Sequence, residues 1–164
     1  MSADRVDFSV VVTLNNGQWQ VQRYKDDFDS LDTSIAAVRS LRAEGPAFAL
    51  LCSEDDYFII VRPTPSRVFA LLSDATYALD DDLAEDVLNE LGIDLPDLDE
   101  DELDDVDPWA EGDFTILEDV GLSEQVMDVI LDDDELWPSE AVMKIAEELG
   151  FEEQLADATG LELS

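Results

Sequence analysis

The residues whose types could most readily do chemistry are the carboxylates of the stretch 94–113, DLPDLDEDELDDVDPWAEGD. This stretch contains no lysine or arginine. Carboxylates at this density could form a calcium loop, which needs a glycine at its sixth position and a glutamate at its twelfth. A loop starting at Asp97 has Glu102 and Pro108 at those positions, and one starting at Asp132 has Trp137 at the sixth. Both spacings fail. The stretch therefore predicts a solvated charge run with at most weak, nonspecific divalent binding, and no metal site.

Paired carboxylates could also act as a catalytic acid and base, provided that an apolar cleft separates their pKa values. No pattern in the sequence indicates such a cleft. The chain has no histidine, and its single cysteine, Cys52, lies in the apolar run FALLCS, which is typical of a buried thiol. It also has no glycine-rich phosphate loop, CxxC pair or HExxH motif. We therefore expect a protein that is not an enzyme and needs no cofactor.

Charge is distributed very unevenly along the 164 residues, whose net charge is −35. Residues 1–67 hold 10 acids and 7 bases, whereas residues 68–164 hold 33 acids and one base, Lys144. Such a field repels phosphates, so direct binding to nucleic acid or to an anionic membrane is disfavoured. An acidic half instead favours a basic protein partner. We expect the scattered bases Arg23, Lys25, Arg39 and Arg42 to lie on a solvated surface.

Two aromatic residues, Trp109 and Phe114, stand at the end of the acidic stretch. One interpretation is that they pack C-terminal helices onto a sheet. The other is that they form an apolar anchor inside a negative rim, a pattern suited to a basic groove on a partner. On the second interpretation, the partner-binding residues are Asp104, Asp105, Asp107, Trp109, Glu111, Asp113 and Phe114.

Hydrophobic periodicity predicts an α+β fold with the order ββαβββα before the acidic stretch. Strands are indicated by β-branched or alternating apolar residues, and helices by apolar residues at helical spacing. Because short links dominate, the sheet should be mostly antiparallel with the two helices on one face. Ser30 or Asp32 could cap the first helix. The aspartates at 80–82 stand at the N-terminus of the second, where the helix dipole favours negative charge. The predicted strands are 8–14, 19–24, 48–52, 57–61 and 67–72, and the predicted helices run from about 31 to 42 and from 82 to 91.

Short helical patterns follow the acidic stretch. Residues 113–120 allow two helical turns at most, Ser123 can cap the next helix, Pro138 suits a first turn, and Phe151 with Leu155 indicates a last helix. We therefore expect an α+β domain over 5–92, an acidic linker over 93–112 and a small all-α C-terminal lobe over 113–159. The start of the chain lacks the apolar core of a signal peptide and no apolar run is long enough to span a membrane, which favours a cytoplasmic protein.

Three blocks resemble a known family in the same order: RVFALLSDATYAL, PWAEGDFTILEDVGLSE and LWPSEAVMKIAEELGF. Together with the acidic middle, they are similar to the actinobacterial tRNA adenosine deaminase-associated proteins. The resemblance implies association with the enzyme that converts wobble adenosine to inosine in tRNA. The deaminase itself needs zinc ligands and a catalytic glutamate, and a chain with no histidine and one cysteine cannot supply that site.

The resulting hypothesis is a non-enzymatic acidic accessory protein that binds a basic protein surface, with the tRNA adenosine deaminase as the implied partner. It could compete with tRNA as a polyanion mimic, or hold the enzyme near another factor. The alternative is a general nucleic-acid-mimicking or stress-related acidic protein that sequesters a basic partner unrelated to tRNA.

Overall fold

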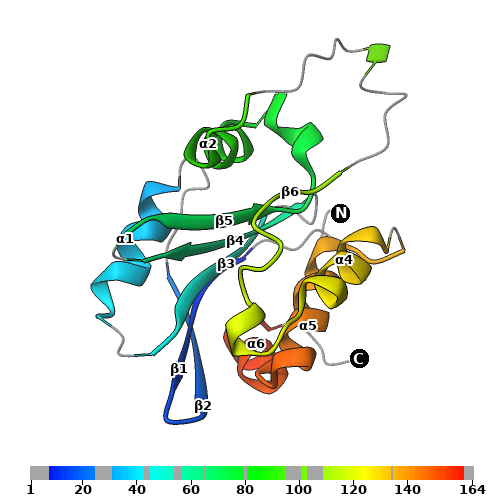
Figure 1. The fold of residues 1–164 in the computed structure, drawn as a ribbon. Coiled ribbons are helices and arrows are strands. Elements are labelled where there is room, and N and C mark those ends of the chain that lie inside the picture. The colour runs from blue at the N-terminus through cyan, green and yellow to red at the C-terminus, as the bar shows by residue number, and fades with distance from the viewer. Residues whose placement is uncertain are drawn as a thin grey trace.

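The computed structural model describes residues 8–24, 31–42, 45–53, 57–64, 66–79, 81–94, 101–102, 109–133 and 135–160. In these residues a single antiparallel sheet is covered by helices on both faces (Figure 1). This confirms the predicted α+β fold. The strand order is β2-β1-β3-β4-β5-β6, with strands β1 (Phe8–Asn15), β2 (Gln18–Arg23), β3 (Ala47–Ser53), β4 (Tyr57–Pro63), β5 (Val68–Leu72) and β6 (Glu111–Gly112).

The composition of each strand follows from how many of its faces are covered. β3 and β4 carry uninterrupted apolar runs, FALLC and YFIIV, and both runs are buried throughout because helices cover both faces of the sheet. The edge strand β2 alternates between half-buried and exposed residues. Its hairpin with β1 turns at Asn16 and Gly17, whose φ angles of 53° and 79° suit an asparagine–glycine turn, as predicted.

Helices α1 (Asp32–Ser40) and α2 (Asp82–Leu91), with the 3₁₀ helix η2 (Ala75–Leu79), cover one face of the sheet. Asp81, one of the three aspartates expected at the N-terminus of this helix, caps α2 by accepting a hydrogen bond from the backbone N–H of Leu83. The helix α1 is where the sequence predicts it, but a cap from Asp32 was wrong, because the N-cap of α1 is Leu31, which makes no side-chain cap hydrogen bond. Ser30, the other predicted cap, lies outside the described residues. The backbone N–H of Leu31 instead donates to Asp86 of α2 at 2.7 Å, so a neighbouring helix supplies the carboxylate.

The C-terminal helices cover the opposite face. They are η3 (Glu118–Val120), α4 (Glu124–Asp132), α5 (Pro138–Leu149) and α6 (Glu152–Thr159). Ser123 caps α4, Pro138 occupies the first turn of α5, and Gly150 ends α5 in the left-handed conformation, as the sequence predicts. Residues 113–120 form turns and the single 3₁₀ turn of η3 rather than an α-helix.

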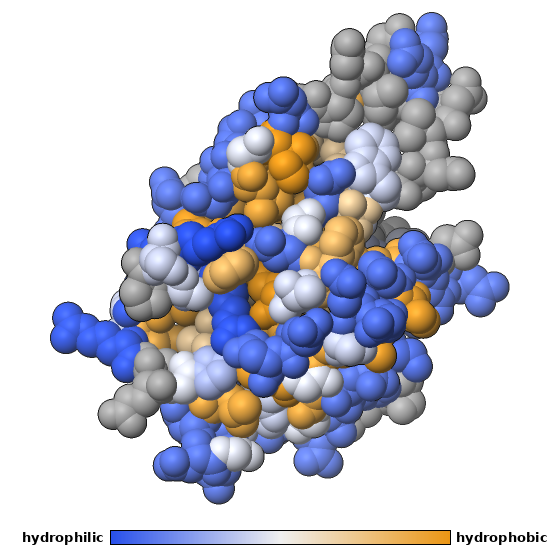
Figure 2. All heavy atoms as spheres, viewed as in Figure 1, coloured by the Kyte–Doolittle hydropathy of each residue, from blue (hydrophilic) through white to orange (hydrophobic). Residues whose placement is uncertain are grey.

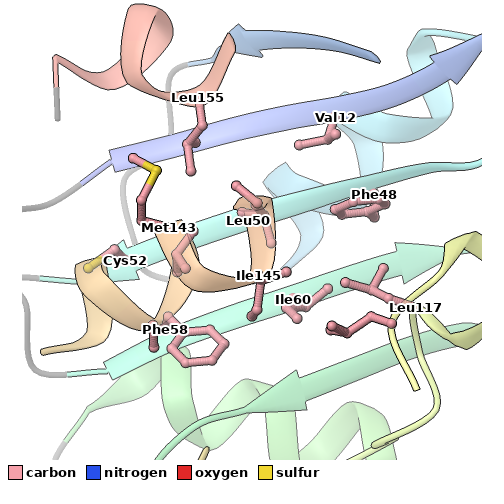
Figure 3. Close-up of a cluster of buried hydrophobic side chains, with 14 of the residues drawn as sticks. Val12, Phe48, Leu50, Cys52, Phe58, Ile60, Leu117, Met143, Ile145 and Leu155 are labelled. Carbon is pink, nitrogen blue, oxygen red and sulfur yellow. The ribbon is translucent and has the colours of Figure 1, made fainter. Parts of the chain in front are cut away.

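Two hydrophobic clusters lie on opposite faces of the sheet. The first joins strand residues to the C-terminal helices, and Figure 3 shows Phe58 and Ile60 of β4 pointing toward Ile145 of α5. Cys52 is fully buried in this cluster, as predicted for a structural thiol. The second cluster joins the other side of the same strands to α1, η2 and α2. The predicted division into a domain at 5–92 and a lobe at 113–159 stays a prediction, and such a lobe would share the first cluster with the sheet.

Candidate protein-interaction surface

The predicted partner-binding residues begin in the acidic stretch and end at a sheet edge. Asp104, Asp105 and Asp107 lie outside the described residues. The remaining ones, Trp109, Glu111, Asp113 and Phe114, belong to a segment that adds β6 to the sheet beside β5, with Glu111 opposite Leu72 and Gly112 opposite Leu71. This strand was not predicted from the sequence, because two residues are too few to show a period-2 pattern.

Trp109 is half-buried against the cluster formed by α1, η2 and α2. Its carbonyl oxygen accepts a hydrogen bond from the backbone N–H of Ala75 at 2.8 Å. Its indole Nε1–H donates to Oε1 of Glu111 at 3.2 Å. The ring therefore already packs on the protein with its polar atom satisfied, and part of its surface stays exposed.

Gly112 and Asp113 fix this segment to β5. A Cβ at Gly112 would lie 2.3 Å from the carbonyl oxygen of Ala70, and the φ of 129° also favours glycine. The backbone N–H of Asp113 donates to the same Ala70 oxygen at 2.9 Å, and its Oδ2 accepts from the Ala70 N–H at 3.3 Å. Oδ1 of Asp113 lies 3.8 Å from Arg67. Asp113 thus has local partners that hold the segment in place.

Phe114 packs on the opposite face from Trp109, against the cluster that includes the C-terminal helices. The two aromatic residues are therefore not brought together into one patch. This arrangement matches the packing interpretation for Phe114, which helps to join the C-terminal part to the sheet. Trp109 instead lies against the α1–α2 layer, on the other side of the sheet.

Exposed carboxylates continue over the outer faces of the C-terminal helices, where the only base is Lys144. On the face shown in Figure 2, hydrophilic residues cover most of the C-terminal helices and hydrophobic side chains are visible between them and α2. The exposed acids of α4, α5 and α6 and of the residue after α4 are Glu124, Asp128, Asp132, Asp133, Glu140, Glu148, Glu153 and Asp157.

Two exposed apolar residues in this acidic region were missed by sequence reasoning. Trp137, at the start of α5, is 60% exposed, and Val129 of α4 is 69% exposed. The backbone N–H of Trp137 donates to Glu140 at 3.0 Å, which fixes the backbone below the ring. The signal available in the sequence was Pro138, since the residue before a helix's first-turn proline lies outside the helix, where its side chain can face solvent.

Two carboxyl groups near the segment have shifted pKa values, in opposite directions. Burial raises the pKa of Asp74, and hydrogen bonds from the Thr76 hydroxyl at 2.5 Å and its N–H at 3.0 Å only partly offset this. The hydrogen bond from Arg62 lowers the pKa of Asp119, which accepts from both guanidinium nitrogens at 2.6 and 2.8 Å. The hydrogen-bond partners that the described residues provide are Thr76 for Asp74 and Arg62 for Asp119, not a second carboxyl as in an acid–base couple.

Groups of three or more potential metal ligands do not occur among the described residues. In the same part of the chain, every helix is too short or too polar to cross a membrane. The described geometry is that of a sheet edge and a helical surface with dense negative charge and isolated apolar residues.

Comparison with known proteins identifies the family of this chain. The chain matches the family described as Rv3753c-like tRNA adenosine deaminase-associated protein over residues 7–152, and it belongs to that family. It is 42% identical over 157 residues to Protein Rv3753c of Mycobacterium tuberculosis (strain ATCC 25618 / H37Rv), an alignment covering 94% of this chain and 89% of that protein. No solved structure matches the chain. The resemblance predicted from the three sequence blocks is thereby confirmed.

Proposed function

We propose that this chain is a non-enzymatic accessory protein that binds the tRNA adenosine deaminase through its acidic surface. The family description supports the partner, because it names association with that enzyme. The observation that carries the binding mode is the charge distribution, with 33 acids and one base after residue 67. A tRNA-handling enzyme needs a positive surface for its substrate, and a negative protein surface complements it.

The absence of an evident catalytic constellation supports a binding role. The chain has no histidine, and its only thiol, Cys52, is fully buried between the sheet and the C-terminal helices. Chemistry on a tRNA base would then belong to the partner, and this chain would act on the partner's access to tRNA or on its location.

Charge alone steers association but gives little specificity, so the contact also needs apolar anchors. Trp109 is the anchor proposed from the sequence, with the carboxylates at 104–113 around it. Trp137 is a second one, because most of its ring is free in this structure and exposed acids lie on the same helices. Burying an aromatic ring of this size at an interface contributes on the order of 2 kcal/mol when it is a hot spot.

The test is a binding titration with the purified deaminase from the same organism, using matched variants. Trp109→Ala and Trp137→Ala each remove one anchor and leave the charge unchanged. Two triple variants each remove three carboxylates: Asp104, Asp105 and Asp107 to Asn in one, and Glu124→Gln, Asp128→Asn and Asp132→Asn in the other. We expect loss of an anchor to raise the dissociation rate, and loss of charge to slow association chiefly at low salt.

The pattern of effects distinguishes the possible roles. A polyanion mimic tolerates loss of either tryptophan but loses affinity in both triple variants. A specific adaptor loses affinity with one tryptophan and responds to only one of the triple variants. If all four variants bind the deaminase as the original chain does, the proposed surface is wrong.

A further inference from the structure

Arginines gather around one pocket of this otherwise acidic molecule. The pocket, of about 500 Å³, lies between the C-terminal end of α1, the start of β3 and the end of β4. Arg39, Arg42 and Arg62 supply its charge, and Val38, Pro46 and Pro63 supply apolar wall. Its volume lies within the range of small-molecule sites, ~300–1,000 Å³. We expected Arg39 and Arg42 to lie on a bland solvated surface, and the fold brings them together with Arg62 around a pocket.

A second pocket adjoins the first and shares Arg62 and Thr64 with it. It is about 450 Å³ in volume and is also lined by Phe69. Above the ring of Phe69, at 4.3 Å from its centre, lies the guanidinium of Arg67. In Figure 2 the deepest blue side chains gather on the half of the face that carries α1. Of the six basic residues that the structure describes, these four arginines lie here, and only Arg23 and Lys144 lie elsewhere.

The arginines differ in how far they are already engaged. Arg62 forms a two-pronged ion pair with Asp119 and donates to the carbonyl of Ile116 at 2.8 Å, so its charge is largely neutralised. Arg39 donates one long hydrogen bond, 3.4 Å, to the carbonyl of Thr64. For Arg42 the described residues provide no side-chain partner, and its side chain is exposed. Arg39 and Arg42 therefore keep most of their donor groups for a ligand.

Backbone geometry at Arg42 is a second, independent observation. Its φ is 48°, the left-handed conformation that glycine or asparagine usually occupies at the end of a helix. An arginine there costs about 1 kcal/mol of conformational energy relative to an ordinary backbone. Strained residues of this kind are concentrated at functional sites, where a side chain must be held in a given place.

We propose that the arginine pocket, formed by Arg39, Arg42, Arg62 and their neighbours, binds a small organic molecule that carries a phosphate or a carboxylate. The guanidinium fork matches the oxygen geometry of both groups, and the apolar wall suits the body of an organic ligand. A polyanion such as RNA would extend into the negative field of the remaining surface. A single small anion experiences mainly the groups within the Debye length, ~8 Å at physiological salt.

The proposal is tested by titrating the full-length chain with AMP, citrate and inorganic phosphate, followed by amide NMR shifts. Saturable shifts at Gly45, Ala47 and Thr64 are expected for AMP, for citrate or for both, and the comparison distinguishes phosphate from carboxylate recognition. Inorganic phosphate lacks an organic body and should bind more weakly. Because no deaminase is present, this result is independent of the proposed function.

Matched variants make the assignment specific. Arg42→Gly removes a guanidinium and is compatible with the positive φ, so this variant should fold at least as stably. Arg39→Gln and Arg23→Gln remove one charge each, inside and outside the pocket. The affinity for the organic anion should fall about tenfold or more in Arg42→Gly and in Arg39→Gln, which is the effect of losing one charge-assisted hydrogen bond. It should stay unchanged in Arg23→Gln. Shifts that never saturate, or equal losses in Arg39→Gln and Arg23→Gln, would overturn the proposal.

Discussion

Asp74 and Asp119 experience opposite environments although both belong to the same acidic chain. Asp74 is half-buried, and its hydrogen bonds with Thr76 offset only part of the cost of burying its charge. Asp119 is more exposed but faces the guanidinium of Arg62. The sign of each contribution to stability is set by the immediate neighbours rather than by the net charge of the chain.

The two carboxyls predict opposite pH effects. Because the folded-state pKa of Asp74 lies above its ordinary value of 3.8, the unmodified chain loses stability as pH rises from 3.8 through that folded-state pKa. Asp74→Asn should therefore gain stability relative to the unmodified chain over this pH range. The lowered pKa of Asp119 means that its contribution is complete above 3.8 and is lost as pH falls through the folded-state value. Asp119→Asn should therefore be less stable at neutral pH, with the difference shrinking in acid. Urea unfolding at several pH values measures both differences, and parallel curves for the two variants would contradict this account.

Gly112 is the residue on which the attachment of β6 depends most directly. Replacing it with alanine should destabilise the chain by about 3 kcal/mol, since the Cβ meets the Ala70 carbonyl in addition to the positive φ. Gly92 is the matched control, with a φ of 74° and nothing within 4 Å of its Cβ position, and Gly92→Ala should cost only about 1 kcal/mol. Equal losses in chemical unfolding would show that the Ala70 contact is unimportant.

Among the elements, the edge strand β2 and the last two helices are joined through Trp19. Its indole N–H donates to the carbonyl of Leu149 at 3.1 Å, and its ring lies 5.0 Å from that of Phe151. Phe151 in turn packs near Phe48 of β3 with ring centres 6.3 Å apart. These contacts connect a strand near the start of the chain to helices at its end.

Loss of this aromatic contact should separate the C-terminal helices from the sheet. Phe151→Ala removes a fully buried ring and should cost about 3–5 kcal/mol, while Trp19→Phe removes one hydrogen bond and should cost about 1 kcal/mol. Trp137→Ala, at an exposed position, should change the free energy of unfolding by no more than about 0.5 kcal/mol. Thermal unfolding of the three variants measures the order of these stability losses. A Phe151→Ala chain as stable as Trp137→Ala would show that the helices do not depend on this packing.

The strands β1, β3 and β4 could be predicted because each contains a run of apolar residues, β-branched in large part in β1 and β4. Helix α2 could be predicted because its apolar residues have helical spacing and aspartates stand at its N-terminus. The cap of α1 could not, since Asp86 reaches Leu31 across 55 residues of chain. The place of Trp109 in the candidate site was predicted only as one of two alternatives, and the structure adds its packing on the α1–α2 side. The arginine pocket depends on three separate segments meeting, which no local pattern reveals.

For the whole molecule, a net charge of −35 opposes compaction through self-repulsion. Added NaCl should therefore raise the temperature of thermal unfolding, most steeply between about 0.01 and 0.15 M, where the Debye length falls from ~30 to ~8 Å. The unfolding temperature of the triple variant, with Asp104, Asp105 and Asp107 replaced by Asn, should rise less with added NaCl. Calorimetry at matched pH measures this, and an unfolding temperature that falls over this range would contradict the role assigned to repulsion.

The same charge should govern association with the deaminase. The most direct test is a titration of the unmodified chain into the purified enzyme, at low and at physiological salt, with inosine formation on tRNA followed in parallel. The account predicts saturable binding that weakens as salt rises without disappearing, together with a changed rate of inosine formation. A deaminase that neither binds this chain at low salt nor changes its rate in the chain's presence would contradict the proposed function.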